Sequence, residues 1–225
     1  MIGLAIILGL IALGFGARRL VERTFESASH DDASCGLTGV ETAQRLLGEH
    51  ATRIGVRTTD EPGWLTDHFD PRTGAIELSD QVGPERSVAA VAVAAHEAAH
   101  AMQSIERNRM FLFRASLTPA SLVASVTYMF IPLIALVTFP FGLGGLLVLV
   151  AIIALSTLLL IEVIGLPVEV GASARALRMV SDQGLLTAAE HRLARRVLIA
   201  AALTYLVAAL TTAALLILWL GGGDD

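Results

Sequence analysis

Four stretches of the chain are apolar over a length that suits a membrane-crossing helix. They are residues 1–17, 117–139, 146–168 and 197–220. About 20 apolar residues in a helix span the roughly 30 Å of bilayer hydrocarbon, so we expect four transmembrane helices. Two prolines inside the second stretch, Pro119 and Pro132, are compatible with a helix that packs in a bundle.

The first apolar stretch does not have the order of a secretory signal. A signal peptide has basic residues before its apolar segment, whereas here Arg18 and Arg19 follow it. We therefore expect residues 1–17 to form an uncleaved first span.

The segment between the first two spans, residues 18–116, carries patterns of a folded unit. Thr38 and Glu41 have the spacing of a capping box, which predicts a helix over about 39–50. Runs rich in β-branched and aromatic residues then predict three short strands, the last two joined by a turn with Pro71 and Gly74. These strands are expected within 53–59, 63–69 and 74–79, and a second helix is expected over about 86–105.

The polar segment 169–196 predicts further helix. Its first part is expected to end at Gly184, and a second capping box, Thr187 with Glu190, opens a helix that continues into the fourth span. The fold class that follows is a mainly α membrane protein of about four transmembrane helices, with a small α+β unit outside the bilayer.

Composition agrees with a membrane location and restricts the partners. The chain is 54% hydrophobic, more than the ~45–50% of soluble domains. Its net charge of −5 leaves no basic surplus to meet phosphates, so we expect no nucleic-acid partner. Cys35 is the only cysteine, which excludes an intrachain disulfide and a cysteine-based zinc cluster.

The arginines set the expected orientation. Eleven of the 16 basic residues, all arginines, lie within 18–116 and the other five within 175–196. With four spans both segments fall on one side, which the positive-inside rule makes cytoplasmic. We therefore expect a multi-pass protein of the cell membrane, with the segments 18–116 and 169–196 in the cytoplasm and both termini outside.

The predicted helix 86–105 contains the sequence HEAAH, with His96, Glu97 and His100. Positions 96 and 100 lie one turn apart on the same helix face, so two imidazoles can bind one Zn²⁺ at ~2.0–2.1 Å. Glu97 lies beside them, where it can act as general base toward a zinc-bound water. The alternative is an alanine-rich surface helix that holds a Glu–His pair by chance.

A catalytic zinc needs a third protein ligand and an open position. The other histidines and the acidic residues are all candidates, and Glu169 is favoured because it follows the third span on the same predicted side of the membrane as the histidines. His68 remains an alternative. A glutamate on a later helix, with a small residue (Ala172) three positions on, is the arrangement of gluzincin-type peptidases.

Six stretches together resemble the YugP-type neutral zinc metallopeptidases, which are multi-pass bacterial membrane proteins. They are SCGLTGVETAQRLL, LTDHFDPRTGAIELS, VAAHEAAHAMQ, LPVEVGASARAL, GLLTAAE and AAALTYLVAAL. The resemblance implies a zincin-like unit in which His96, His100 and Glu169 bind Zn²⁺ and Glu97 is the catalytic base. The family pattern has Gly at the position of Ala99 and Asn at those of Gly171 and Ile199. Any hydrogen bond that these two Asn make around the metal in the family is therefore not expected here, whereas the ligands are unchanged.

Four other residues are candidates for the surroundings of the site or for substrate binding. Asp67 and His68 lie on a predicted strand that can support the site or hold a peptide at a sheet edge; the alternative is a plain hairpin whose turn is capped by Asp70. Tyr205 can donate a hydrogen bond to an oxyanion, or belong to the interfacial aromatic belt. Glu162, inside the third span, can support the site from below or pair with a polar residue of the bundle.

The sequence therefore predicts a membrane-bound zinc endopeptidase that acts on peptides or membrane proteins, consistent with quality control of membrane proteins. An intramembrane protease is less favoured, because residues 88–103 are short and charged at the centre and no LDG-type aspartate motif follows. A four-span scaffold or metal-binding protein without catalysis is the remaining alternative. Glu97 distinguishes the endopeptidase from the protein without catalysis, because a site that only binds metal has no need of this glutamate.

Overall fold

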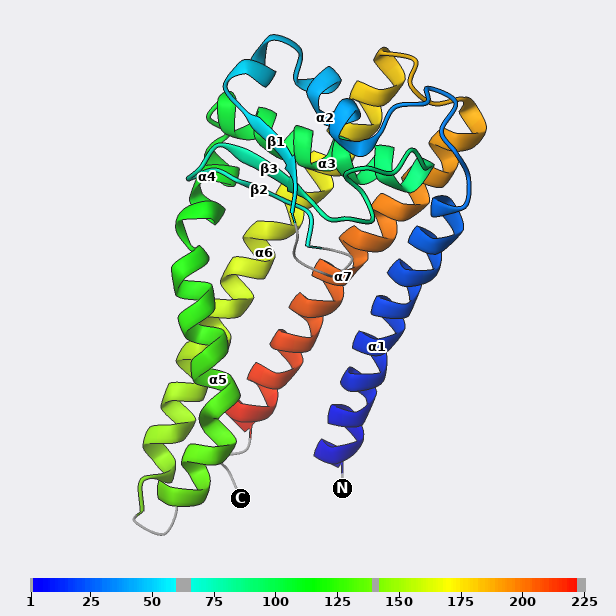
Figure 1. Ribbon diagram of the computed structural model, residues 1–225. Helices are drawn as coiled ribbons and strands as arrows, with labels where there is room; N and C mark the ends of the chain where they lie inside the picture. The colour runs from blue at the N-terminus through cyan, green and yellow to red at the C-terminus, as the bar shows by residue number, and fades with distance from the viewer. Residues whose placement is uncertain (1, 60–65, 139–141, 222–225) are drawn as a thin grey trace.

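The structure, a computed structural model, describes residues 2–59, 66–138 and 142–221. Its helices are α1 (Ile2–Ser29), α2 (Gly39–Leu47), α3 (Val88–Ile105), α4 (Arg109–Ser116), α5 (Thr118–Thr138), α6 (Gly144–Asp182) and α7 (Ala188–Gly221), with a 3₁₀ helix η1 (Gly48–Thr52). The strands are β1 (Gly55–Thr58), β2 (His68–Asp70) and β3 (Ala75–Leu78). In Figure 1 the helices α1, α5, α6 and α7 extend to one end of the molecule, where both termini lie, and α2, α3 and the strands form a layer at the other end.

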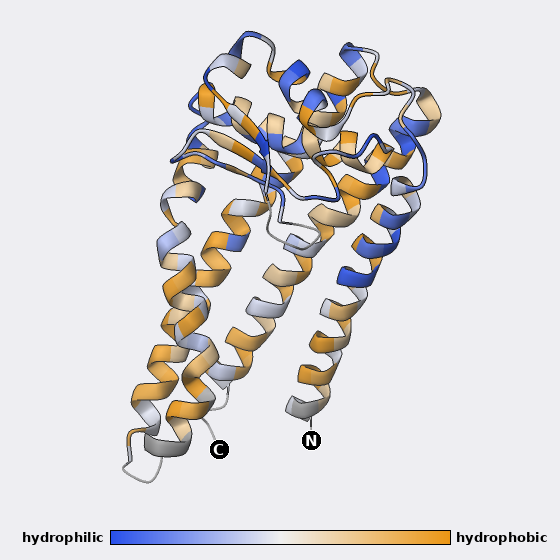
Figure 2. Ribbon diagram, in the orientation of Figure 1, coloured by the Kyte–Doolittle hydropathy of each residue, from blue (hydrophilic) through white to orange (hydrophobic). Residues whose placement is uncertain are grey.

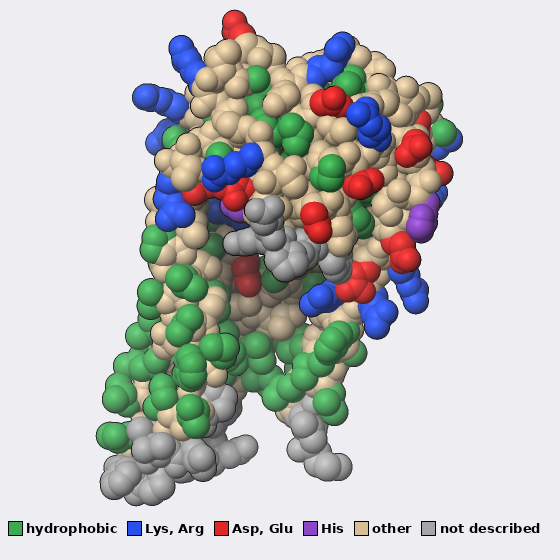
Figure 3. Space-filling view, viewed as in Figure 1, with side chains coloured by type: hydrophobic (Ala, Val, Ile, Leu, Met, Phe, Trp, Pro, Cys, Tyr) green, Lys and Arg blue, Asp and Glu red, His purple; other side chains and the backbone are tan. Residues whose placement is uncertain are grey.

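Within the described residues, two helices are long and apolar enough to cross a membrane, α6 and α7. The bent pair α4 and α5, with 43° between its two parts, makes a third if it counts as one span. Apolar residues dominate the long helices where they project away from the layer of α2, α3 and the strands (Figure 2). Charged side chains gather on that layer (Figure 3). The third and fourth predicted spans thus lie within α6 and α7, whereas a count of four spans and the side of the membrane remain predictions.

The α6 helix is longer than the sequence predicted. The third span and the helix expected after it form one continuous helix through Pro167, which lies inside α6. Proline removes one backbone hydrogen bond, but a helix packed against neighbours tolerates this loss. Gly184, with φ of +61°, follows the end of α6 in the left-handed conformation that glycine adopts readily.

The three strands form a small mixed sheet of order β1-β3-β2. β1 pairs with β3 in parallel, and β2 pairs with β3 in antiparallel through the predicted turn. The turn contains Gly74, whose φ of +67° favours glycine, and Asp70 accepts a hydrogen bond from the Arg72 amide at 2.8 Å, as expected of a turn cap. Part of the second predicted strand lies outside the described residues.

The α3 helix lies in the middle of the buried core. Ser87 caps its start by accepting a hydrogen bond from the Ala90 amide, and nearly every residue up to Ala101 is buried. It packs against α2, α6 and α7, with the sheet on another side. Because its buried positions are mostly alanine, neighbouring backbones approach closely, which brings side chains of α6 within reach of His96 and His100.

Candidate metal centre

Three potential ligand atoms converge between α3 and α6. Nε2 of His96 and Nε2 of His100 lie 3.1 Å apart, as expected of imidazoles one helical turn apart. Oε2 of Glu169, from the middle of α6, lies 3.2 Å from the first and 3.3 Å from the second nitrogen. Among the described residues, these three side chains form the group that could hold a metal ion.

The dimensions of this triangle fit a zinc ion. Ligand atoms at ~2.0–2.1 Å from a tetrahedral zinc are about 3.3–3.4 Å apart, so the three side chains need to move little to bind one. Two neutral nitrogens and a carboxylate oxygen are also the donor types that zinc binds at catalytic sites.

Each histidine has a hydrogen-bond partner at its second nitrogen. Nδ1 of His100 lies 2.9 Å from Oε1 of Gln103, and Nδ1 of His96 lies 3.3 Å from Oγ of Ser173. If each imidazole donates its Nδ1 proton to this oxygen, both Nε2 lone pairs face the Glu169 carboxylate with no proton between them. A cation at the centre then satisfies all three groups, which is the usual arrangement around a metal-bound histidine.

The other oxygen of Glu169 belongs to an ion pair that the sequence did not predict. Nη2 of Arg114, from the last turn of α4, lies 3.0 Å from Oε1 of Glu169. Gln103 and Ser173 were also missed, although each is three or four residues from a predicted ligand on the same helix, a spacing that could have identified them.

Glu97 is nearly buried beside the triangle, with 7% of its surface exposed. Burial raises the pKa of its carboxyl, although His96 and His100 counteract part of this effect. Burial by itself lowers the pKa of His100, but its hydrogen bond to Glu169 and the charges of Glu97 and Glu169 outweigh this and raise it. The raised pKa makes the Glu97 carboxylate a stronger base than a solvent-exposed one, which suits proton transfer.

A cavity of about 210 Å³ opens beside Glu97. His96, Glu97 and Glu169 border it on one side, and residues of α1 and α7 form an apolar wall on the other. The wall residues are Val21 and Phe25 of α1 together with Val197, Leu198, Ala201 and Ala202 of α7. The site is therefore accessible to a small apolar group next to the candidate base.

Of the two predicted residues near β2, Asp67 borders the cavity and His68 does not belong to the metal group. Asp67 accepts hydrogen bonds from the amide and hydroxyl of Ser79, at 2.8 and 3.1 Å, and burial raises its pKa in spite of them. His68 is exposed, with Nδ1 2.8 Å from the Thr66 carbonyl. The alternative of His68 as third ligand is thus not supported, since the structure brings Glu169 to the histidines instead.

The two remaining candidates, Tyr205 and Glu162, lie in different surroundings. Tyr205 lines the same cavity as Glu97, and its ring centre lies 5.8 Å from Cζ of Arg114. Glu162 instead accepts a hydrogen bond from the hydroxyl of Thr212 on α7, at 3.1 Å. Of the two possibilities for Glu162, the structure therefore shows the pairing with a polar residue of the helix bundle.

The fold and the site define a class: a mainly helical protein with apolar helices long enough to cross a membrane and a candidate His–His–Glu metal centre. The chain belongs to the family described as "Putative neutral zinc metallopeptidase", which it matches over residues 3–222. The "Putative membrane protease YugP" of Bacillus subtilis (strain 168) is 36% identical to it over 202 residues, or 90% of this chain and 88% of that protein. No solved structure matches the chain significantly. The family resemblance inferred from the motifs is thereby confirmed.

Proposed function

We propose that this protein is a membrane-bound, zinc-dependent endopeptidase that hydrolyses peptide bonds with water. The observation that carries the proposal is the shared cavity: Glu97 borders it together with His96 and Glu169, whose ligand atoms converge with that of His100. The candidate base and the candidate metal position thus face the same small volume, where a peptide bond and a water molecule can meet.

Each residue has a definite role in this proposal. His96, His100 and Glu169 hold the zinc ion. When bound, zinc supplies Lewis acidity, which lowers the pKa of a water molecule toward ~7 and polarises a carbonyl group. Glu97 accepts the proton of the attacking water and passes it to the leaving amine. Tyr205, across the cavity, donates a hydrogen bond to the oxyanion that forms on the carbonyl.

The substrates in this proposal are segments of membrane proteins, and the biological role is quality control in the cell membrane. Two features support it. The arginines lie in the two segments that four spans would put on the cytoplasmic side, so the site acts there. The cavity wall is built by α1 and α7, whose continuations are apolar, so the site lies where these helices leave the bilayer.

The test uses the full chain purified in detergent. We expect about one zinc ion per chain and cleavage of unstructured polypeptides such as casein, with products identified by mass spectrometry. Glu97→Gln should retain zinc and lose cleavage, because it removes the base but no ligand. Glu49→Gln, an exposed glutamate on η1, is the matched control and should behave as the parent protein.

The second candidate function is a metal-binding or scaffold membrane protein without catalysis. The buried carboxyl of Glu97 argues against it, because burial of a carboxyl is unfavourable and metal binding alone gives no reason for it. If the parent protein binds zinc and neither it nor Glu97→Gln cleaves any polypeptide, this second function replaces the first. If the parent protein binds no zinc, the zinc endopeptidase and a zinc-binding role are both excluded, and a scaffold without metal is left.

A further inference from the structure

The two oxygens of the Glu169 carboxylate have separate partners. Oε2 faces Nε2 of both histidines, whereas Oε1 lies 3.0 Å from Nη2 of Arg114. Only 4% of the Glu169 side chain is exposed, so water has little access to Oε1. The guanidinium is thus a close charged partner of the oxygen that does not face the candidate metal position.

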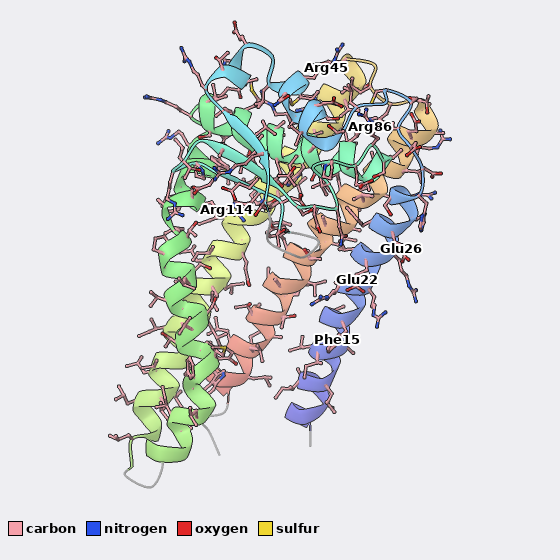
Figure 4. The ribbon with its side chains drawn as sticks, viewed as in Figure 1. Phe15, Glu22, Glu26, Arg45, Arg86 and Arg114 are labelled. Atoms are coloured by element: carbon pink, nitrogen blue, oxygen red, sulfur yellow. The ribbon has the colours of Figure 1, made fainter. Side chains whose placement is uncertain are left out.

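Arg114 is itself held in place from two further sides. Its Cζ lies 5.8 Å from the ring centre of Tyr205 on α7, within the range of a cation–π contact. On α6, Gly165 leaves room for the guanidinium, because a Cβ at this position would lie 3.1 Å from Nε. Arg114 (labelled in Figure 4) therefore lies between α6 and α7, although it comes from α4.

We propose that Arg114 is a positioning residue that restricts Glu169 to one metal-binding oxygen. While Arg114 holds Oε1, only Oε2 is available to the metal. A catalytic zinc needs three protein ligands and one open position, and a carboxylate that bound through both oxygens would occupy that position. This inference rests on the proposed function only in taking the His–His–Glu group as a zinc site; it does not require that the protein cleaves peptides.

The charge of Arg114 and its proposed positioning role predict opposite changes in zinc affinity when Arg114 is replaced. A positive guanidinium near a divalent cation repels it, so removal of the charge alone would tighten zinc binding. If Arg114 instead orients Glu169, its removal lets the carboxylate rotate, and binding must then order this side chain. Loss of a partner that orients a metal ligand typically lowers metal affinity or activity about 10–100-fold.

The first experiment measures the zinc Kd of the full chain in detergent by competition with a chromophoric chelator. Arg114→Met keeps the length of the side chain without charge or donors, and we expect its Kd to rise about 10–100-fold. Arg114→Lys keeps the charge but not the planar fork of donors, and should lie between the parent and Arg114→Met. Arg109→Met, an exposed arginine on the same helix, is the matched control and should keep the parent Kd.

A second variant disturbs the ion pair without changing any charge. In Gly165→Ala the new methyl group would lie 3.1 Å from Nε of Arg114, so the guanidinium must move. Alanine is the better helix former, so a purely structural role of this region predicts equal or higher thermal stability and an unchanged Kd. The positioning role predicts a weaker zinc affinity in this variant although all three ligands and Arg114 are present.

The geometry of the bound metal gives an independent readout. Co²⁺ in place of zinc absorbs visible light strongly when four-coordinate and weakly when five-coordinate. Arg114→Met should therefore lose absorption, because Oε1 becomes free to bind.

The inference is overturned if Arg114→Met binds zinc as tightly as the parent or more tightly, or if a weaker Kd comes with an unchanged Co²⁺ spectrum. Should Arg114→Met fail to fold, Gly165→Ala and Arg114→Lys decide by the same two readouts, and a parent protein that binds no zinc excludes the inference together with the proposed function.

Discussion

Gln103 and His100 lie one turn apart on α3, and Oε1 of the glutamine lies 2.9 Å from Nδ1 of the histidine. The same amide donates from Nε2 to the carbonyl of Val168 on α6, at 3.3 Å. That second bond fixes which end of the amide faces His100, because only the NH₂ group can donate to a carbonyl. The imidazole therefore donates its Nδ1 proton to Gln103, and its Nε2 lone pair faces the candidate metal position.

Replacement of Gln103 should weaken metal binding without removing a ligand. In Gln103→Leu the imidazole of His100 loses the acceptor that orients it, so we expect the zinc Kd to rise about 10–100-fold. A chelator competition on the full chain in detergent measures it. Gln44→Leu, on the exposed face of α2, is the control. An unchanged Kd in Gln103→Leu would show that the ring is held by packing alone.

The local part of the site could be predicted from the sequence because it depends on helix geometry. A helix was expected over 86–105 and α3 is Val88–Ile105, so the spacing of His96 and His100 implied a shared face. The two capping boxes are present for the same reason, since Thr38 and Glu41, and Thr187 and Glu190, are close in the chain. Glu169 came from its place after the third span and from the family pattern, and the structure places it at the histidines.

The remaining features depend on how elements that are distant in the chain pack together. Arg114 and Glu169 are separated by the whole of α5, and no local pattern indicates that they meet. The bond between Glu162 and Thr212 depends on the rotation of α6 against α7, which hydropathy does not specify. Asp67 and His68 illustrate a smaller ambiguity. Both were candidates, but neighbours in an extended chain point to opposite sides, and in the structure Asp67 borders the cavity whereas His68 does not.

The buried carboxyl of Asp67 predicts a pH dependence of stability. Burial raises its pKa above 3.8, so folding favours the protonated form. Its contribution to stability is therefore fully present below pH 3.8 and is lost as the pH rises through the higher pKa of the folded state. Asp67→Asn has no such loss and keeps an acceptor for Ser79. We expect the variant to gain stability relative to the parent as the pH rises from about 4 to 7.

Denaturant unfolding of the metal-free full chain in detergent, at several pH values, measures this difference. Asp31→Asn removes an exposed aspartate and keeps Asp67; it is the control, and its stability should follow that of the parent over this pH range. A difference between Asp67→Asn and the parent that stays constant over this range would contradict the raised pKa.

The apolar wall of the cavity predicts an effect of α1 on substrate preference. Val21 is 2% exposed and lines the cavity opposite His96 and Glu169. An apolar cavity of ~150 Å³ accepts a benzene molecule, so about 210 Å³ is enough for one apolar side chain next to the scissile bond. The measured quantity is kcat/KM for a peptide with Phe next to the scissile bond, divided by kcat/KM for the same peptide with Ala there. Val21→Phe should lower this ratio and Val21→Ala should raise it, each by roughly 10-fold.

Peptide pairs that differ only in this residue, assayed by mass spectrometry, measure the ratio. Leu13→Phe enlarges an exposed residue of the same helix and should leave the ratio unchanged. Opposite shifts in the two Val21 variants would exclude a general loss of stability as the cause. If both variants keep the parent ratio, α1 does not contact the substrate.

The pairing of Glu162 with Thr212 predicts a stability effect that leaves the metal centre unchanged. Thr212 is 7% exposed and donates to Oε1 of Glu162, and among the described residues Oε2 of Glu162 has no hydrogen-bond partner. Thr212→Val keeps the shape of the side chain but removes the donor, and with it the one hydrogen bond that the described residues give this carboxyl. We expect a loss of about 1–3 kcal/mol in the free energy of unfolding, measured by titration from mild detergent into dodecyl sulfate. Thr212→Ser retains the hydroxyl and should lose less. The zinc Kd should be the same in all three proteins, and a weaker Kd in Thr212→Val would restore the hypothesis that Glu162 supports the site from within the bundle.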